Sequence, residues 1–90
     1  MRAYQGRIFR LDGHLVRLYE SARYLRVRIP DTPAQLGRRL ADALRASRIR
    51  EAVVRVALIP DGATARPGER VALPSIVVLP IQPPTAFQYR

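Results

Sequence analysis

Three polar residues with helical spacing could bind an anion. His14, Arg17 and Ser21 stand at positions i, i+3 and i+7 of a segment, residues 12–27, whose apolar residues follow a helical repeat. A helix would place all three on one flank of a leucine stripe, where the planar fork of a guanidinium suits a phosphate. The same spacing is more often that of an ordinary half-exposed helix edge with a hydrogen-bonded histidine, and by itself it favours that interpretation.

Arg55 is the second residue that could do chemistry, because it interrupts an apolar run. It lies between Val54 and Val56 in a segment rich in β-branched residues. Burying an unpaired guanidinium costs several kcal/mol. We therefore expect Arg55 to meet a carboxylate, a group of carbonyls or a ligand anion, unless it lies on an edge strand and reaches water.

The composition excludes several kinds of chemistry. The 90 residues include 16 basic and 7 acidic side chains, a net charge of +9, and every basic residue is an arginine. Without a lysine the chain cannot supply a Schiff base, and without a cysteine it cannot supply a thiolate nucleophile, a disulfide or a thiolate metal site. A single histidine excludes a histidine-rich metal site. Because the usual catalytic motifs are also missing from the sequence, we predict no catalytic residue in this chain.

Two helices are predicted to hold the polar residues in place. The first spans about residues 12–27, with Asp12 at its N-cap. The second spans about residues 33–47 and follows a capping-box pattern, in which Thr32 is the N-cap and Gln35 reaches back to it. Both helices are amphipathic, so each is expected to pack one apolar face against the rest of the fold.

Three further segments are predicted to form strands. Residues 52–59 indicate a strand buried largely on both faces, 71–79 a strand interrupted or pushed to an edge by Pro74, and 4–11 a further strand. Strands combined with two consecutive helices predict an α+β fold, a small antiparallel sheet with both helices on one face. The other face would be left open, to be covered by something outside these residues.

The domain organisation and the location follow from simple features of the chain. Residues 1–80 are predicted to form one small domain, incomplete at its start, and the proline-rich residues 81–90 an interdomain linker. The sequence has neither an apolar run of membrane-spanning length nor the apolar core of a signal peptide at its N-terminus. We therefore expect a cytoplasmic protein that does not bind membranes.

The string from residue 4 to residue 23 resembles a known family. Its core is Phe-Arg-Leu, two residues, His-Leu, one residue, Arg-Leu, two residues and Ser-Ala, which begins at Phe9 and ends at Ala22. This string is similar to the N-terminal small domain of the class IV, or fold-type IV, pyridoxal-phosphate aminotransferases, and most similar to the branched-chain amino acid aminotransferases. A looser likeness extends over nearly the whole chain.

The resemblance implies roles for individual residues. Arg17 matches the family arginine that binds the phosphate of pyridoxal 5′-phosphate, and Arg2 and Arg55 match arginines on the substrate side of the cleft. His14 and Ser21 would stand behind the residues that contact the ligands. The family's large domain, which carries the Schiff-base lysine and most of the cofactor pocket, would lie beyond residue 90.

From the resemblance we expect the N-terminal part of an enzyme that moves the amino group of a branched-chain amino acid to 2-oxoglutarate. Amino acids and 2-oxo acids would be its ligands and the missing large domain its partner. The complete enzyme would be a homodimer, and the 90 residues alone would be inactive. The chain departs from the family pattern at Val53, where tyrosine is frequent, and at Pro60 and Asp61, where Arg-Gly is frequent. These departures keep aminodeoxychorismate lyases and D-amino acid transaminases open as alternatives.

Two other classes of function remain for a chain of this composition. An arginine-rich nucleic-acid-binding domain would use the net charge of +9 to neutralise phosphates and would bind DNA or RNA with a steep salt dependence. Interleaved aromatic residues are scarce and the arginines are spread over several elements, which argues against that class. The third class is a purely structural or interaction module, such as the remnant of an enzyme.

Overall fold

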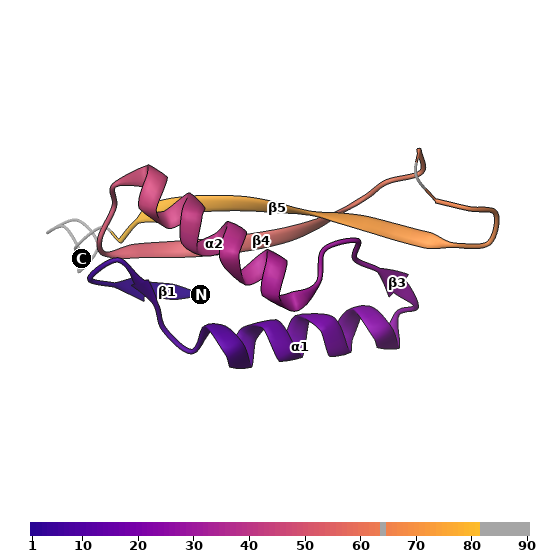
Figure 1. The fold of residues 1–90 in the computed structure, drawn as a ribbon, viewed down its shortest axis with the longest axis horizontal. Coiled ribbons are helices and arrows are strands. Elements are labelled where there is room, and N and C mark those ends of the chain that lie inside the picture. Colours follow the sequence, from indigo (N-terminus) through magenta and orange to yellow (C-terminus); the bar gives the residue numbers. More distant parts are fainter. Residues whose placement is uncertain (64, 82–90) are drawn as a thin grey trace, which may run out of the picture.

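Two long strands run through the whole fold, as Figure 1 shows. These strands, β4 (Ala52–Pro60) and β5 (Arg70–Pro80), pair in antiparallel fashion along nearly their full length. The structure is a computed structural model that describes residues 1–63 and 65–81. The other elements are, in chain order, β1 (Arg2–Tyr4), β2 (Arg7–Ile8), α1 (Leu11–Tyr24), β3 (Val27–Arg28) and α2 (Pro33–Ser47).

The five strands form one sheet in the order β2-β1-β4-β5-β3. All neighbouring strands are antiparallel except β3 and β5, which make a short parallel pair. The predicted α+β fold, a small sheet with two consecutive helices, is thereby confirmed, and the parallel pair is an addition that the sequence did not predict. β3 follows shortly after α1. Arg26 has a positive φ (56°), which turns the chain out of the helix and toward β5, so that β3 can pair with it.

A tight hairpin joins β1 to β2 at the N-terminus. Its two central residues, Gln5 and Gly6, both have positive φ, 53° and 77°. This combination matches the right-handed twist of the flanking strands and is tolerated best by glycine. The segment predicted as one strand, residues 4–11, instead holds the last residue of β1, the hairpin turn and β2, and the chain enters α1 after Phe9 and Arg10.

The two helices begin in different ways. Thr32 accepts a hydrogen bond from the backbone N–H of Gln35 at 3.1 Å, and the Gln35 side chain accepts one from the backbone N–H of Thr32 at 2.9 Å, which confirms the predicted capping box. At α1, Arg10 occupies the N-cap in the left-handed conformation, and its carbonyl accepts a bond from the N–H of His14. The prediction that Asp12 caps α1 is wrong. Its carboxylate lies inside the first turn, where it complements the helix dipole.

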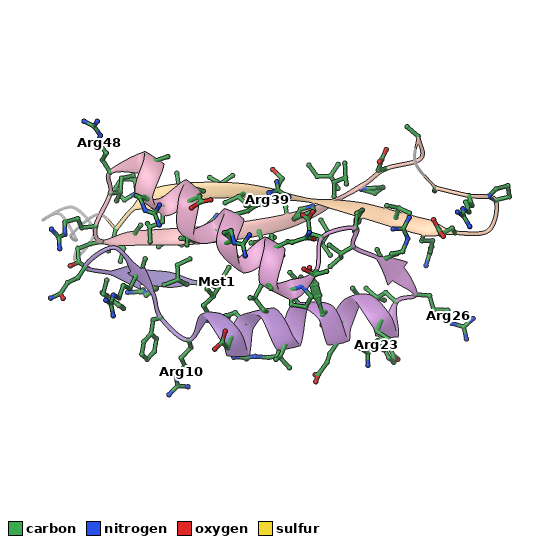
Figure 2. All side chains as sticks on the ribbon, viewed as in Figure 1. Met1, Arg10, Arg23, Arg26, Arg39 and Arg48 are labelled. Atoms are coloured by element: carbon green, nitrogen blue, oxygen red, sulfur yellow. The ribbon has the colours of Figure 1, made fainter. Side chains whose placement is uncertain are left out.

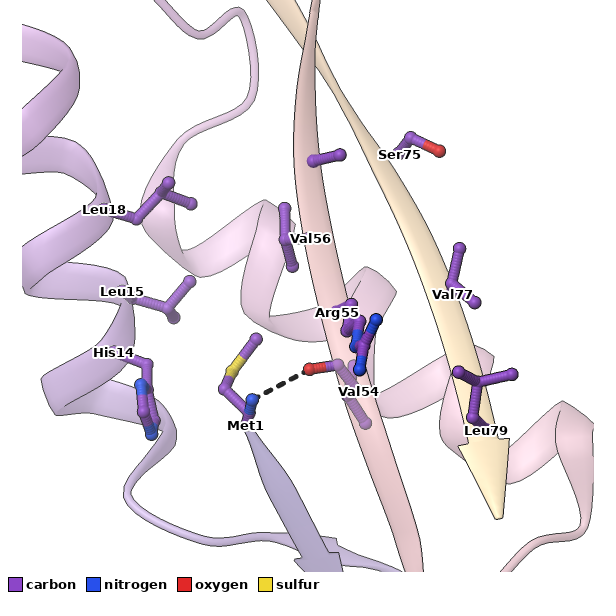
Figure 3. A pocket seen from close by; sticks show the side chains of 11 residues that line it. Met1, His14, Leu15, Leu18, Val54, Arg55, Val56, Ser75, Val77 and Leu79 are labelled. Carbon is purple, nitrogen blue, oxygen red and sulfur yellow. Dashed lines mark hydrogen bonds between the residues drawn. The ribbon is translucent and has the colours of Figure 1, made fainter. Parts of the chain in front are cut away.

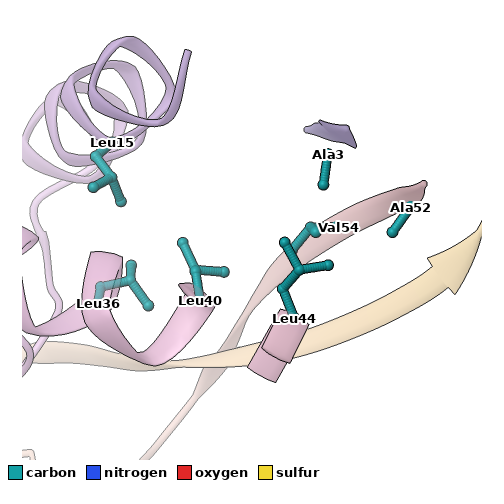
Figure 4. Packing of buried hydrophobic residues seen from close by; sticks show 7 residues of the cluster. All are labelled: Ala3, Leu15, Leu36, Leu40, Leu44, Ala52 and Val54. Atoms are coloured by element: carbon teal, nitrogen blue, oxygen red, sulfur yellow. The ribbon is translucent and has the colours of Figure 1, made fainter. Parts of the chain in front are cut away.

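The core forms where α2 meets β4. Leu36 and Leu40 of α2 and Val54 of β4 are fully buried. Figure 4 shows the whole cluster, to which α1 adds one leucine: Ala3, Leu15, Leu36, Leu40, Leu44, Ala52 and Val54. Because Leu15 belongs to this cluster, α1 lies on the same side of β4 as α2; α2 packs on the long strands, whereas α1 packs mainly against α2 and β3. Burying each leucine or valine side chain of the cluster stabilises the fold by roughly 1.5–3 kcal/mol.

β4 alternates between two faces instead of being buried on both, so that prediction is wrong. The residues under α2 are buried or half-buried, and we call them the covered face: Ala52, Val54, Val56 and Leu58. The intervening residues and their partners on β5 are half-buried or exposed, and we call them the open face: Val53, Arg55, Ala57, Ile59, Leu73, Ser75, Val77 and Leu79. The sequence did predict that one sheet face would lack a cover, and within residues 1–63 and 65–81 none is present.

Pro74 was predicted either to interrupt the second long strand or to place that strand at an edge of the sheet. Strand β5 continues through Pro74 without interruption, and at this position β5 is the outer strand of the sheet. Pro74 lies opposite Leu58. Val54 directs its N–H to the carbonyl of Met1 at 2.7 Å, away from β5, and alternation gives Leu58 the same direction. Pro74 is therefore at a position that exchanges no hydrogen bonds with β4. Its ring nitrogen faces the outer edge of β5, which the two-residue β3 covers only at its start.

The predicted boundary between a domain of residues 1–80 and a linker of residues 81–90 stays a prediction. Strand β5 ends at Pro80, and the N–H of Ile81 donates to the carbonyl of Glu51 at 3.0 Å. The rest of the predicted linker lies outside the described residues. Neither helix in the described part of the chain is long and apolar enough to cross a membrane.

Candidate functional site

A cavity of about 600 Å³ lies between α1 and the two long strands. Figure 3 shows His14, Leu15 and Leu18 on its α1 side and the strand residues on the opposite side. Its lining is mostly apolar: Met1, His14, Leu15, Leu18, Val54, Arg55, Val56, Ala57, Ser75, Val77 and Leu79. The cavity thus connects residues of the open face with the helix that carries the predicted anion-binding flank.

The cavity exists because β1 covers only the first part of β4. The chain end of β1 is fixed there, since the Met1 amino group donates to the carbonyl of Val54 at 2.9 Å, as the dashed line in Figure 3 shows. In the described residues no strand pairs with this edge of β4 beyond Val54. By alternation the backbone groups of Val56 point to the same edge. An extended or polar ligand would therefore find unpaired backbone groups beside an apolar wall.

Within the described residues, four polar groups line the cavity: a guanidinium, an imidazole, a hydroxyl and an amino group. Arg55 extends from β4, His14 from α1 and Ser75 from β5, and the Met1 amino group lies between the two walls. Among the residues that the structure describes, no carboxylate lines this cavity. An apolar cavity whose charged groups are all cationic favours a ligand with an anionic head and an apolar body.

His14 is neutral at neutral pH. Burial lowers the pKa of its imidazole below the usual 6.5, and the positive charges of the chain's amino group, Arg17 and Arg10 lower it further. The neutral ring keeps one nitrogen that donates a hydrogen bond and one that accepts. His14 therefore serves this cavity as a polar, uncharged group beside several permanent cations.

The structure brings together some of the predicted site residues and separates others. Arg55 and His14 line the cavity, on opposite walls. Arg2 lies opposite Val53 in the β1–β4 pair, so it shares the open face with Arg55. Arg17 and Ser21 are exposed on α1 and are not part of the cavity lining. Helical spacing places Arg17 one turn from His14 and Ser21 one turn further along the helix.

The side chain of Arg17 fits the role of an anion ligand. It is exposed, and in the described ranges it makes no ion pair, unlike Arg28, Arg39 and Arg45, which pair with carboxylates. The positive charge of its guanidinium contributes to lowering the pKa of His14, so the two side chains interact electrostatically. Figure 2 shows that Arg10 before α1, Arg23 in its last turn and Arg26 after it project outward, so further cations lie at both ends of the helix.

Sequence reasoning missed the β5 side of the cavity. Ser75, Val77 and Leu79 were read only as members of a strand, yet they share the open face with Arg55. The sequence signal was Ser75 itself, a hydroxyl in an apolar strand, but only the structural register shows that Ser75 lies opposite Ala57. A sequence fixes strand register poorly when both faces carry apolar residues.

One of three comparisons with known proteins found a match. The family model described as amino-transferase class IV matches residues 1–90. Searches of the curated proteins and of the solved structures found no match. Because the family model covers the whole chain, the chain belongs to the class IV aminotransferases.

Proposed function

We propose that this chain forms the cofactor- and substrate-binding small domain of an aminotransferase that uses pyridoxal 5′-phosphate. The amino donor would be a branched-chain amino acid and the acceptor 2-oxoglutarate. The observation that carries the proposal is the apolar cavity with Arg55 on one wall, His14 on the other and, within the described lining, no carboxylate. Membership in the class IV family supplies the type of reaction.

The cavity suits a substrate with a carboxylate and a branched aliphatic side chain. The forked donors of Arg55 can hold both oxygens of a carboxylate, and Arg2 adds a second positive charge on the same face. Leu15, Leu18 and Val77 offer apolar surface to a side chain. Desolvating that side chain against the wall and pairing the carboxylate would together orient the substrate.

The exposed Arg17 would hold the phosphate of the cofactor. When bound, the cofactor supplies the electron sink that lets an amino group pass between an amino acid and a 2-oxo acid. The chain itself contributes binding and orientation: Arg17 anchors the phosphate, and the leucines of α1 exclude water from the cavity behind it. Since the sequence contains no lysine, the residue that moves the proton must come from outside these 90 residues, and the chain alone is expected to be inactive.

Other members of the class remain the alternative. The small side chains of Val53 and Ala57 on the open face leave room for a substrate of different shape, as in an aminodeoxychorismate lyase or a D-amino acid transaminase. All three activities need an anionic substrate head, so Arg55 has the same role in each. The shape of the rest of the ligand distinguishes them.

The first test is ligand binding to the chain as it stands. NMR titration with 4-methyl-2-oxopentanoate, the 2-oxo acid of leucine, should shift the signals of the cavity residues, and pyruvate should bind less tightly because it lacks the apolar body. Arg55→Ala should weaken the binding, whereas Arg38→Ala, an exposed arginine of α2, should not. Equal binding of both acids, or equal loss in both variants, would contradict the proposal.

The second test is activity. Joined in frame to the large domain of a class IV aminotransferase, the chain should support amino transfer from L-leucine to 2-oxoglutarate. D-alanine reports the D-amino acid transaminase alternative in the same assay, and release of pyruvate from aminodeoxychorismate without an acceptor reports the lyase alternative. A preference for either of them would replace the branched-chain assignment and leave the family assignment intact.

A further inference from the structure

Three positive charges act on His14, and a further cation lies across the cavity from it. On its own helix Arg10 and Arg17 act on it, and the Met1 amino group acts on it from the end of β1. Arg55 of β4 occupies the opposite wall of the cavity. The carboxylates of α1 lie elsewhere, because Asp12 and Glu20 line a groove on another side of the helix.

Such surroundings keep the imidazole uncharged only as long as no anion is present. A neutral histidine beside these three cations avoids one more like charge but has one hydrogen-bond donor fewer than the protonated ring. A phosphate dianion brought to Arg17 would cancel much of the surrounding positive potential. An opposite charge within about 4–6 Å favours the charged form of a titratable group, which for histidine is the protonated ring.

We propose that His14 takes up a proton from the solvent when a phosphate dianion binds at Arg17 and so becomes the second cation of the anion site. The inference rests on the proposed function, which places the phosphate at this arginine. It goes beyond that function by making anion binding and protonation of one named side chain a single linked event. His14 is then a positioning residue, since it acts by holding the anion that Arg17 anchors.

The helix geometry supports a joint site. Positions i and i+3 of a helix have Cβ atoms roughly 5–6 Å apart, which is close enough for two side chains to reach one phosphate. The carboxylate-free lining of the cavity means that, in the part of the chain that the structure describes, protonated His14 would find no acidic partner there. The ligand itself must then supply the negative charge.

The chain offers a clean readout, because His14 is its single histidine. A pH titration of the one imidazole C–H signal by NMR gives its pKa without and with sulfate, which stays a dianion throughout the titration, and with inorganic phosphate. Sulfate should raise the pKa by about one unit or more, and phosphate should raise it by less, because in the pH range of the titration most of the phosphate is the monoanion. Sodium chloride at the same ionic strength should raise it less, because it screens the neighbouring cations without occupying the site.

Two variants link the shift to Arg17. Arg17→Ala should abolish most of the anion-dependent shift, whereas Arg23→Ala, an exposed arginine of the same helix that lines the other groove, should retain it. If both variants retain the shift, or if phosphate binding is detected by ³¹P NMR while the histidine signal does not move, the inference is wrong. The second result would leave the cofactor role of Arg17 untouched.

Pyridoxamine 5′-phosphate and pyridoxamine separate the sources of the anion. Neither carries an aldehyde that could react with the amino group of Met1. We expect pyridoxamine 5′-phosphate to shift the His14 signal and pyridoxamine to leave it in place. If free phosphate shifts the signal but pyridoxamine 5′-phosphate does not bind, the linked protonation stands and the proposed cofactor role fails. If no oxyanion changes the signal, the linked protonation is refuted.

Discussion

The two faces of β4 use the same strand for opposite purposes. On the covered face, Val54 lies fully buried against the leucines of α2. On the open face, Arg55 is exposed, and apolar neighbours such as Val77 remain 46% exposed. Residues adjacent in sequence thus belong to different parts of the molecule, because successive side chains of a strand point to opposite sides of the sheet.

The difference shows how the described part of the chain divides its apolar surface between two uses. One face supplies the contacts that stabilise the fold, and the other keeps apolar side chains accessible at a free energy cost. Exposed apolar patches of this kind commonly mark binding surfaces. If the division is correct, substitutions on the covered face should change stability and substitutions on the open face should change ligand binding.

The largest expected effect is the loss of a core leucine. Leu40→Ala removes a fully buried side chain of α2 and should lower the free energy of unfolding by about 2–5 kcal/mol. Leu73→Ala on the open face is the matched control, because Leu73 is 45% exposed, and it should cost less than about 1 kcal/mol. Urea denaturation measures both. Equal losses would mean that the open face also stabilises the fold and would break the comparison.

The second effect is a change in ligand affinity that leaves the free energy of unfolding nearly unchanged. Arg55→Ala should weaken binding of 4-methyl-2-oxopentanoate by roughly 10- to 100-fold, the value of a charge-assisted hydrogen bond. The free energy of unfolding should stay within about 0.5 kcal/mol of wild type, since the described part of the chain holds no carboxylate paired with Arg55. A variant that unfolds more easily by several kcal/mol would show that Arg55 has a structural role.

Local signals predicted much of the fold. The capping box of Thr32 and Gln35 fixed the start of α2, because both partners lie within four residues of each other. The start of α1 was predicted less well, since Arg10 adopts a left-handed conformation that no local preference indicates. The faces of β4 could not be assigned, because an apolar run has no alternation to read and only the placement of α2 decides which side is buried.

The site was also predicted only in part, because local sequence signals show single residues but not which of them the fold brings together. Arg55 stood out as a charge among apolar residues, and the resemblance pointed to His14 and Arg17. Only the β4–β5 register and the cavity show that Arg55 shares a site with His14 and Ser75. The roles of Arg2, Arg17, Ser21, His14 and Arg55 toward ligands stay predictions, because they depend on ligand contacts.

The third effect lies away from both faces of β4 and tests whether stability is set by the covered face alone. Thr32→Ala removes the side chain that caps α2 and should cost about 1 kcal/mol. Thr32→Ser keeps the hydroxyl and should cost only a fraction of that. Thermal or urea unfolding measures the difference. If the two variants were equally stable, helix α2 would be held only by its buried leucines.

The smallest expected effect is a pH dependence of the free energy of unfolding, caused by His14, which lines the cavity from α1. Its pKa is lowered in the folded chain by burial and by the neighbouring cations, whereas the unfolded chain has the ordinary value of 6.5. Between these two values the unfolded chain binds more protons, so the free energy of unfolding falls as the pH drops below about 6.5 and stops falling for this reason below the native pKa.

The variant His14→Gln has no imidazole to titrate, so it lacks this fall in the free energy of unfolding, and comparison with wild type measures it. Because the chain has one histidine, carboxylates titrate equally in wild type and variant, and the difference between their stability curves reports His14 alone. The difference should be largest on the acid side of pH 6.5 and should shrink when sulfate is added, since a bound dianion favours the protonated ring. Parallel curves for the two proteins would mean that His14 has the same proton affinity in both states and that the cationic wall of the cavity does not act on it.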